Sequence, residues 1–422
     1  MARRRQLARN VSVVGAGMSG FGMFPELDSK DLFLEAFGDL GHSVDSGFDP
    51  SEIEALYFGN FTNDFFVGQS HWGAILSDAL GLVPAPATRT EGACASSGLA
   101  FREACFAIAS GFYDVVLVGG VEDMSKRSTA EVSEGLALAA IPYELDAGFN
   151  FPGVFGAIAS AYFDKYDATR EHLINVTIKS HENAARNPRA QLSKSVPQMM
   201  ESKARRAAER GHETPVWSDP REFLRDEKAN PVVASPLHLF DCCPISDGAA
   251  CLLLVAEEIA GRFTDHPLQV AGIGQGSGRG LQAAPELTSF EATRAAAEEA
   301  YQMAGLGPAD IQFAEVHDCF SIAELIHIED LGFFEAGHGH LATADGLTGL
   351  QGSMPINTSG GLKCKGHPVG ATGAAQLVEV WQQLRQQAKD RQVPGNDLSI
   401  GLAHNLGGTG GTSSVTILRR GA

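Results

Sequence analysis

The chain repeats its own order of strands and helices, and this repeat limits the folds that it can adopt. A short apolar run broken by glycine at Val11–Gly17 is matched by a similar run at Leu268–Gly274. Further along, the segment Pro50–Phe58 is matched by Pro308–Val316. Strands that alternate with helices indicate α/β layering. The sequence therefore predicts an α/β fold in which two similar halves pack together as a pseudo-symmetric body.

The repeat also predicts domain boundaries. Amphipathic helical patterns precede the second pair of matches at residues 30–40 and 290–304. The alternation of strands and helices then breaks down between about residues 122 and 241, where an aromatic segment and a charged segment follow each other. We therefore expect three parts: an N-terminal half of residues 1–121 and 242–262, an inserted loop or cap domain of residues 122–241, and a C-terminal half of residues 263–422.

Composition excludes several classes of partner. The net charge of −19 argues against nucleic acid or an anionic membrane as the main partner. A local basic cluster can still bind an anion, and the charged part of the insertion carries Arg205, Arg206 and Arg210. These arginines are read either as a solvated helix or as part of a cap that meets an anionic group. Apolar runs in the chain stay shorter than a membrane span, so no membrane segment is expected.

Cysteine usage indicates a reducing compartment. Seven cysteines without paired spacing do not predict a disulfide framework, and the chain contains no C-x-x-C motif. The basic start Met1–Arg5 is followed by a short apolar run that glycine interrupts, which does not predict a signal peptide. We expect a cytoplasmic protein. The pair His338 and His340 offers too few ligands for a metal site, and no metal is expected.

Cys94 is the first candidate catalytic residue. It lies in Glu91–Gly98, directly before a helical pattern whose first turn Ser96 or Ser97 could cap. A thiol at a helix N-terminus faces free backbone N–H groups and the positive end of the helix dipole, which favour the reactive thiolate. A buried, inert cysteine is the alternative for Cys94 taken alone.

Three later loops change that balance. They are Glu315–Phe320, Gly361–Gly373 and His404–Gly411, and each contributes a cysteine, histidine or asparagine next to an apolar stretch or a helix start. A nucleophile candidate together with acid–base residues on separate loops is typical of catalysis by an activated thiol.

These four loops together resemble the thiolase superfamily. The resemblance rests on the Cys94 loop, His317-Asp318-Cys319-Phe320, Gly366-His367-Pro368 and His404-Asn405-Leu406-Gly407, and it extends from Val11 to Leu418. The motifs are similar to those of sterol-carrier-protein-type and archaeal acetoacetyl-CoA thiolases, because a His-Asp-Cys-Phe motif replaces Asn-Glu-Ala-Phe. The resemblance implies a duplicated, five-layered αβαβα fold with the active site where the two halves meet.

The resemblance also implies residue roles. Cys94 takes an acyl group from an acyl-CoA, His367 accepts the thiol proton, and Cys319 acts as the second acid or base. His317 and His367 are candidates for holding an enolate oxygen. Backbone N–H groups of Cys94 and of the loop at Leu406 and Gly407 are candidates for a tetrahedral oxyanion, as such sites require. The role of His404 is left open, and it is a possible catalytic residue.

The implied reaction is a Claisen condensation of acyl-CoAs, or thiolysis of a 3-oxoacyl-CoA by coenzyme A. Coenzyme A thioesters are then substrates, with no permanently bound cofactor, and Arg205, Arg206 and Arg210 could contact the phosphates. The family implies a homodimer or larger oligomer, and a possible small partner built from an OB-fold and a zinc ribbon. Alternatives are a ketosynthase-like enzyme, which needs no thiol at Cys319, an acyltransferase or retro-aldolase with a non-CoA acceptor, and a non-catalytic lipid carrier or scaffold.

Overall fold

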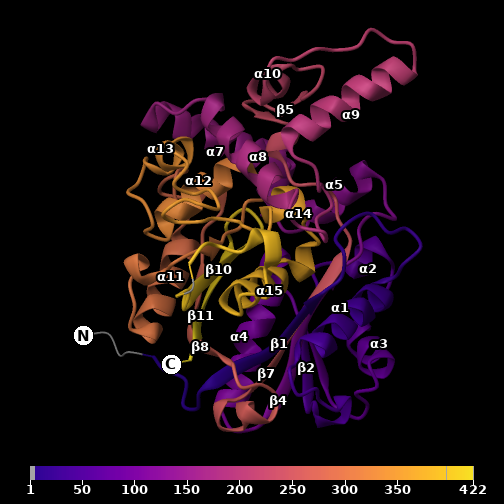
Figure 1. Ribbon diagram of the computed structural model, residues 1–422, viewed down its shortest axis with the longest axis vertical. Coiled ribbons are helices and arrows are strands. Elements are labelled where there is room, and N and C mark those ends of the chain that lie inside the picture. The colour runs from indigo at the N-terminus through magenta and orange to yellow at the C-terminus, as the bar shows by residue number, and fades with distance from the viewer. Residues whose placement is uncertain (1–4, 396, 422) are drawn as a thin grey trace.

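A single mixed sheet runs through the protein, which is described by a computed structural model for residues 5–395 and 397–421 (Figure 1). Most of the basic start of the chain lies outside these described residues. The strand order is β3-β2-β4-β7-β1-β8-β11-β10-β9. The strands are β1 (Val11–Met18), β2 (Ala55–Gly59), β3 (Ala87–Thr90), β4 (Val115–Glu122), β7 (Gly248–Ala256), β8 (Leu268–Ser277), β9 (Ala314–Glu315), β10 (Ile400–Gly407) and β11 (Thr412–Arg420).

The strand order confirms the predicted duplication. β1 and β8, the two matched runs, lie next to each other and pair antiparallel at Ser12 with Gln269. From this joint outward, β7, β4 and β2 of the first half correspond to β11, β10 and β9 of the second. The matched proline segments each form a 3₁₀ turn, at Pro50–Glu52 and Pro308–Asp310, followed by a strand. The expected helices are α1 (Ser29–Ser43) and α11 (Glu291–Ala304).

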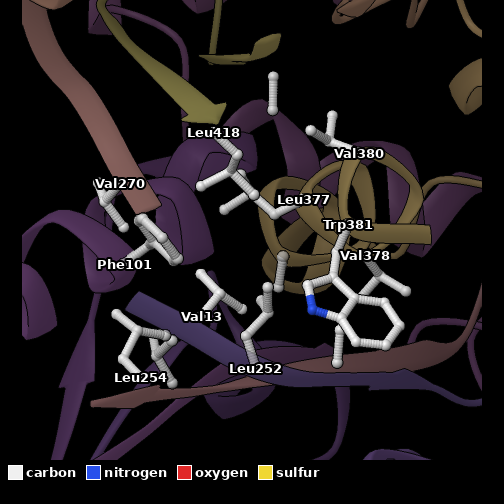
Figure 2. Close-up of a cluster of buried hydrophobic side chains, with 14 of the residues drawn as sticks. Val13, Phe101, Leu252, Leu254, Val270, Leu377, Val378, Val380, Trp381 and Leu418 are labelled. Carbon is white, nitrogen blue, oxygen red and sulfur yellow. The ribbon is translucent and has the colours of Figure 1, made fainter. Parts of the chain in front are cut away.

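The helices and the two halves of the sheet form five layers, in which each half of the sheet lies between outer helices and a shared central pair of helices. α4 (Ser96–Ala109) and α15 (Thr372–Leu384) form the central layer, because each contacts strands of both halves. α1 and α3 (Trp72–Ala79) cover the outer face of the first half, and α11 covers the outer face of the second. Figure 2 shows the resulting core, in which Trp381 and Leu377 of α15 and Phe101 of α4 meet strand residues such as Val13 and Leu252.

The region between β4 and β7 is mostly helical. Its helices are α5 (Thr129–Ala137), α6 (Pro142–Asp146), α7 (Phe151–Tyr166), α8 (Arg170–Ala184), α9 (Val196–Glu209) and α10 (Pro220–Arg225), and a small hairpin joins β5 (Val232–Ala234) to β6 (Leu237–His238). Figure 1 shows α9, α10 and β5 on an arm that projects beyond α8. The aromatic segment forms α7, which packs with α12 (Ser321–Asp330) of the second half.

Shorter helices complete the described chain: α2 (Asn63–Phe66), α13 (Gly339–Ala344) and α14 (Gly361–Lys365). Within residues 5–395 and 397–421, no helix has both the length and the apolar character needed to cross a membrane. All seven cysteines are free thiols.

Candidate active site

The four loops singled out in the sequence converge beside the central helix pair. Cys94 lies in a 3₁₀ turn, Ala93–Ala95, that leads into α4, while His367 lies between α14 and α15. His317 follows β9 and precedes α12. The Cys94 sulfur and one ring nitrogen from each of these two histidines all lie within 4.8 Å of one another. Two halves of the chain therefore supply one compact group of a thiol and two imidazoles.

The first turn of α4 differs from the predicted cap. Ser96 and Ser97 are the first two helical residues, and the capping position falls on Ala95, because the preceding 3₁₀ turn moves the helix start. The Ser96 hydroxyl instead donates to the Ala93 carbonyl over 2.6 Å and accepts from the Gly92 N–H. Ser97 accepts from the Ala374 N–H at the start of α15 over 3.0 Å. The serines thus fix the Cys94 turn and join the two central helices.

Burial, rather than the helix terminus, dominates the acidity of Cys94. Desolvation raises the pKa of its thiol to about 12, although N–H groups of Gly408 and of Cys94 itself act in the opposite direction. The raised pKa of Cys94 contradicts the expectation of a ready thiolate, since an enclosed site disfavours the charged form. Cys94 rests as a neutral thiol and needs a base at the moment it reacts.

The N–H group that acts on the Cys94 sulfur from the glycine loop belongs to Gly408. The sequence had suggested Leu406 and Gly407, which instead lie in β10 opposite Ser413 and Thr412 of β11. Gly408 follows directly after the strand and has a positive φ of 62°. This backbone conformation, which suits glycine, takes Gly408 out of the strand ladder and allows its N–H group to reach the Cys94 sulfur.

His367 is held in the tautomer that a base requires. Its Nδ1 lies 2.6 Å from the Thr372 hydroxyl, which itself donates to the Pro368 carbonyl over 3.0 Å. Because the hydroxyl proton is already donated, Nδ1–H of His367 is the donor and Nε2 carries the free lone pair. Burial lowers the pKa of His367 to about 3, so the ring is neutral at physiological pH.

His317 is held in the opposite tautomer. The Asn405 side-chain N–H₂ donates both to the Cys94 carbonyl over 3.0 Å and to His317 Nδ1 over 3.2 Å. Burial keeps the pKa of His317 well below its ordinary value. A neutral ring that accepts at Nδ1 carries its proton at Nε2, so His317 can donate to a developing oxyanion. Asn405 belongs to a quoted motif, but its bridging position could be found only in the folded chain.

The backbone of Cys319 pairs with that of Cys243, a cysteine that the sequence analysis did not place in the site. The Cys243 N–H donates to the Cys319 carbonyl over 3.0 Å, and Cys242 bridges Phe320 in the same antiparallel pairing. Burial raises the pKa of Cys319 well above its usual range, and Cys243 and Cys94 raise it further. Cys94, Cys243 and Cys319 are therefore near neighbours. The preceding Cys242 and the following Pro244 gave no signal of this placement.

His404 lies beside the site rather than in the group of Cys94, His317 and His367. Its Nε2 is 3.1 Å from the Thr293 hydroxyl, and its Nδ1 accepts from the His317 backbone N–H over 3.4 Å. Its ring also packs against His327, with 4.4 Å between the ring centroids. Burial lowers the pKa of His404 to about 3. With both nitrogens engaged, His404 fits a positioning role better than an acid–base role.

Glu122, which the sequence analysis did not identify, ties the loops around Cys94 together. Its carboxylate accepts from the N–H groups of Phe61, Thr62 and Gly370 at 2.8, 3.1 and 3.0 Å. Burial raises the pKa of Glu122 to about 7. Glu122 ends β4, so one strand end fixes both the loop after β2 and the turn that follows His367.

The candidate phosphate contacts lie on the projecting arm, with Arg205 and Arg206 in α9 and Arg210 directly after its last residue. Arg206 and Arg210 line an open pocket of about 480 Å³ together with Lys203, Trp217 and Lys228. Arg205 does not line this pocket, and its Nε lies 3.9 Å from Oε1 of Glu209. The arm connects to the site through α8, which packs against both α9 and α14.

Two family models divide the chain much as the duplication does. Residues 11–258 match the thiolase N-terminal domain, and residues 275–420 match the thiolase C-terminal domain. The chain therefore belongs to the thiolase family, and it is a thiolase-type acyltransferase.

Named relatives agree with this assignment. Acetyl-CoA acetyltransferase of Methanothermobacter thermautotrophicus is 40% identical over 98% of this chain and 100% of its own. Sterol carrier protein 2 of Bos taurus is 30% identical over 100% of this chain and 74% of its own. The two relatives correspond to the two thiolase types suggested by the His-Asp-Cys-Phe motif.

Solved structures share the fold. The Ltp2-ChsH2(DUF35) aldolase has a TM-score of 0.77 at 24% identity, covering 97% of both chains. Human mitochondrial 3-ketoacyl-CoA thiolase has a TM-score of 0.68 at 17% identity, covering 99% of this chain and 100% of the other. The acetyl-CoA acetyltransferase relatives, which match nearly the whole chain, support a thiolase-type acyltransferase.

Proposed function

We propose that Cys94 carries the acyl group of a coenzyme A thioester, with acetyl as the default group. The observation that carries this proposal is the approach of the Cys94 sulfur to His317 and His367 within 4.8 Å. His367 Nε2 takes the thiol proton as the sulfur attacks the thioester carbonyl. The N–H groups of Cys94 and Gly408 then stabilise the tetrahedral oxyanion, a contribution of about 2.7–4 kcal/mol per donor in comparable sites.

The second half-reaction uses Cys319. In the condensation direction, the coenzyme A thiolate that leaves in the first half-reaction takes the proton of Cys319. The resulting Cys319 thiolate removes an α-proton from a second acyl-CoA, and Nε2–H of His317 donates to the enolate oxygen. The carbanion attacks the Cys94 thioester, the Cys94 sulfur leaves and takes back the proton held by His367, and a 3-oxoacyl-CoA is released. In the reverse direction, coenzyme A cleaves that product. Each thiol gives up one proton and regains it within the cycle, so both return to the neutral form that burial favours.

The basic pocket on the arm is our candidate for the phosphates of coenzyme A. The side chains of Lys203, Arg206, Arg210 and Lys228 line this pocket together with Trp217, a combination suited to phosphate charge and to a stacked base. Arg205 contributes positive charge nearby. We infer that a pantetheine arm would run from this pocket along α8 to Cys94, with the inserted residues 122–241 acting as a cap.

The remaining proposals concern assembly and place. The net charge of −19 leaves little positive surface, so a small OB-fold and zinc-ribbon partner could complete the coenzyme A site. One structural neighbour, the Ltp2-ChsH2(DUF35) aldolase, carries a DUF35 component in its name. We also propose a cytoplasmic homodimer. The aldolase reaction of that neighbour is not extended to this chain, since a likeness at 24% identity shows the fold alone.

The acyl-enzyme is tested by mass spectrometry after incubation with acetyl-CoA. Cys94→Ala should form no adduct, whereas Cys319→Ala should still be acylated at Cys94 and fail at condensation and thiolysis. His367→Ala should slow acylation itself, by about 100-fold for loss of a general base. Cys251→Ala is the matched control, because Cys251 is equally buried but lies in β7. An adduct on another cysteine, or near-normal thiolysis by Cys319→Ala, would overturn these roles.

The partner proposal is tested with the chain purified alone. Thiolysis with an ordinary KM for coenzyme A would show that the arm suffices, and it would refute the need for a second protein. Arg206→Ala with Arg210→Ala should raise that KM about tenfold while leaving Cys94 reactive, since exposed charges act mainly on binding of the charged substrate. Activity that appears only with a co-purifying polypeptide would support the partner.

A further inference from the structure

The thiol of Cys94 lies in a closed apolar cluster. The cluster combines Cys94 with buried side chains from four other segments, and they are Phe61, Phe66, Met124, Val132 and Val369. The partly buried side chains that pack against this cluster are Phe65, Val67, Leu136, Ala139 and Ile245. An acyl group on the Cys94 sulfur must place its alkyl tail in apolar surroundings, because its carbonyl oxygen is directed to the N–H groups. This cluster is where such a tail would go.

Phe66 belongs both to this cluster and to the lining of an open pocket. Phe66 ends α2 and is 1% exposed. It also lines an open pocket of about 580 Å³ beside Val67, Trp72 and Ile75. The ring is held in place by Gly135 of α5, where a Cβ atom would come within 2.5 Å of Phe66.

We propose that Phe66 determines the length of the acyl group that Cys94 accepts. The proposal rests on the proposed role of Cys94 as the acylated residue. The Phe66 ring belongs both to the cluster around Cys94 and to the lining of the pocket, so it separates the two and should restrict Cys94 to a short, unbranched acyl group. A smaller side chain would join the cluster to the pocket behind it, whose apolar wall of Val67, Trp72 and Ile75 would accept a medium-length tail.

Charged groups that line the pocket limit the length of the acyl tail that it would accept. Lys126 and Arg127 line the pocket, and Lys126 is paired with Asp123 over 2.6 Å. A hydrocarbon that reached this rim would displace water from charged groups without replacing their contacts, which is unfavourable. We therefore expect the widened site to favour acyl groups of about six to eight carbons over longer ones, since the apolar wall is short.

The test compares acylation of Cys94 by acetyl-CoA and by octanoyl-CoA in single-turnover mass spectrometry. The wild-type protein should strongly prefer acetyl-CoA. Phe66→Ala should raise the octanoyl to acetyl rate ratio at least tenfold. Phe65→Ala is the matched control, because Phe65 also abuts Gly135 but does not line the pocket, and its ratio should stay within about twofold of wild type.

Two outcomes separate this proposal from the one it rests on. If acetyl-CoA leaves no adduct on Cys94 in the wild-type protein, the acyl-enzyme itself is wrong. If Cys94 is acetylated but Phe66→Ala does not change the ratio, Phe66 does not set the acyl length. Should Phe66→Ala fail to fold, as judged by circular dichroism, Phe66→Leu is used, and it should raise the ratio at least threefold. An unchanged ratio in a folded Phe66→Leu overturns the proposal equally.

Discussion

At the scale of single residues, burial sets the protonation states of the site. It raises the pKa of Cys94 to about 12 and lowers that of His367 to about 3. Desolvation acts against the charged form in both cases, so a neutral thiol faces a neutral imidazole. The pair differs in this respect from a thiolate–imidazolium pair, in which the thiol pKa is far below its usual value. Proton transfer must then accompany attack on the substrate.

This difference predicts the pH dependence of Cys94 alkylation. Iodoacetamide reacts with the thiolate, and below a pKa of about 12 the thiolate fraction rises tenfold for each pH unit. We expect the alkylation rate at Cys94 to rise by that factor across pH 7 to 10, without a plateau. Timed peptide mapping measures it. A rate that levels off below pH 8 would indicate a pre-formed thiolate and contradict the neutral pair.

Asn405 provides a second prediction at this scale. Its side-chain N–H₂ group donates to His317 Nδ1, which holds that nitrogen as an acceptor, and also donates to the Cys94 carbonyl. Asn405→Ala should release the His317 tautomer and lower kcat for thiolysis about 100-fold, the effect of losing one oriented donor, with little change in the KM for coenzyme A.

The control is Asn187→Ala, which also removes a buried side-chain amide. The Asn187 amide donates to the Ser359 carbonyl with a distance of 2.8 Å, and it does not contact the reacting groups. Its kcat per folded molecule should stay near that of wild type. A thiolysis rate for Asn405→Ala close to this control would show that His317 keeps its tautomer without the amide.

The sequence could predict which residues meet, but not how each is protonated. The motifs that contain Cys94, His317 with Cys319, His367 and His404 placed four loops in one site. The positions of Cys243 and Glu122 depend on pairings between segments distant in sequence, which no local pattern encodes. The same holds for the pKa of Cys94, because burial of the whole site outweighs the local effect of the helix start.

At the scale of elements, the site depends on close packing of α4 against α15. A Cβ atom on Gly373 of α15 would lie 2.6 Å from the Gly98 backbone nitrogen of α4 and 2.4 Å from Asn405 Oδ1. These two glycines therefore let the helix that follows Cys94 approach the helix that follows His367. The duplicated pattern predicted both helices. The contact between them follows only once the halves are folded together.

Gly373→Ala should separate these helices and damage the site. The added methyl group has no space, and overpacking of this kind costs about 1–3 kcal/mol of the free energy of unfolding. We also expect at least a tenfold loss of kcat, because Asn405 must move. Chemical denaturation and thiolysis rates measure the two effects.

Gly38→Ala in α1 is the matched helical control, since a Cβ there meets nothing within 4 Å. It should stabilise the protein by about 0.5–1 kcal/mol and leave kcat unchanged. If Gly373→Ala behaved like Gly38→Ala, the close approach of α4 and α15 would not be what holds the site.

At the scale of the whole molecule, the duplication leaves the two ends of the sheet unequal. β9 is buried at one end, and Ala314 next bridges Ile356. β3 forms the other end and is partly exposed. The first half has this additional strand, whereas β9 ends the second half, so the pseudo-symmetry stops at β3. The family models and the strand order agree on the two halves, while the boundaries of the inserted cap remain our proposal.

The open edge at β3 leads to the last prediction, that two copies pair through this strand. The Leu56 N–H donates to the Pro86 carbonyl and the Asn60 N–H to the Thr90 carbonyl, so alternate residues of β3 face β2. Ala87 and Arg89 then direct their backbone groups outward, and an unpaired edge is a template for a second copy.

Light scattering should give twice the chain mass of 44.6 kDa. Ala87→Pro removes one outward N–H without breaking the β2 ladder, so it should shift the protein toward monomer, whereas Ala87→Val should not. A monomeric wild-type protein at micromolar concentration, or a dimer that Ala87→Pro leaves intact, would place the assembly surface elsewhere.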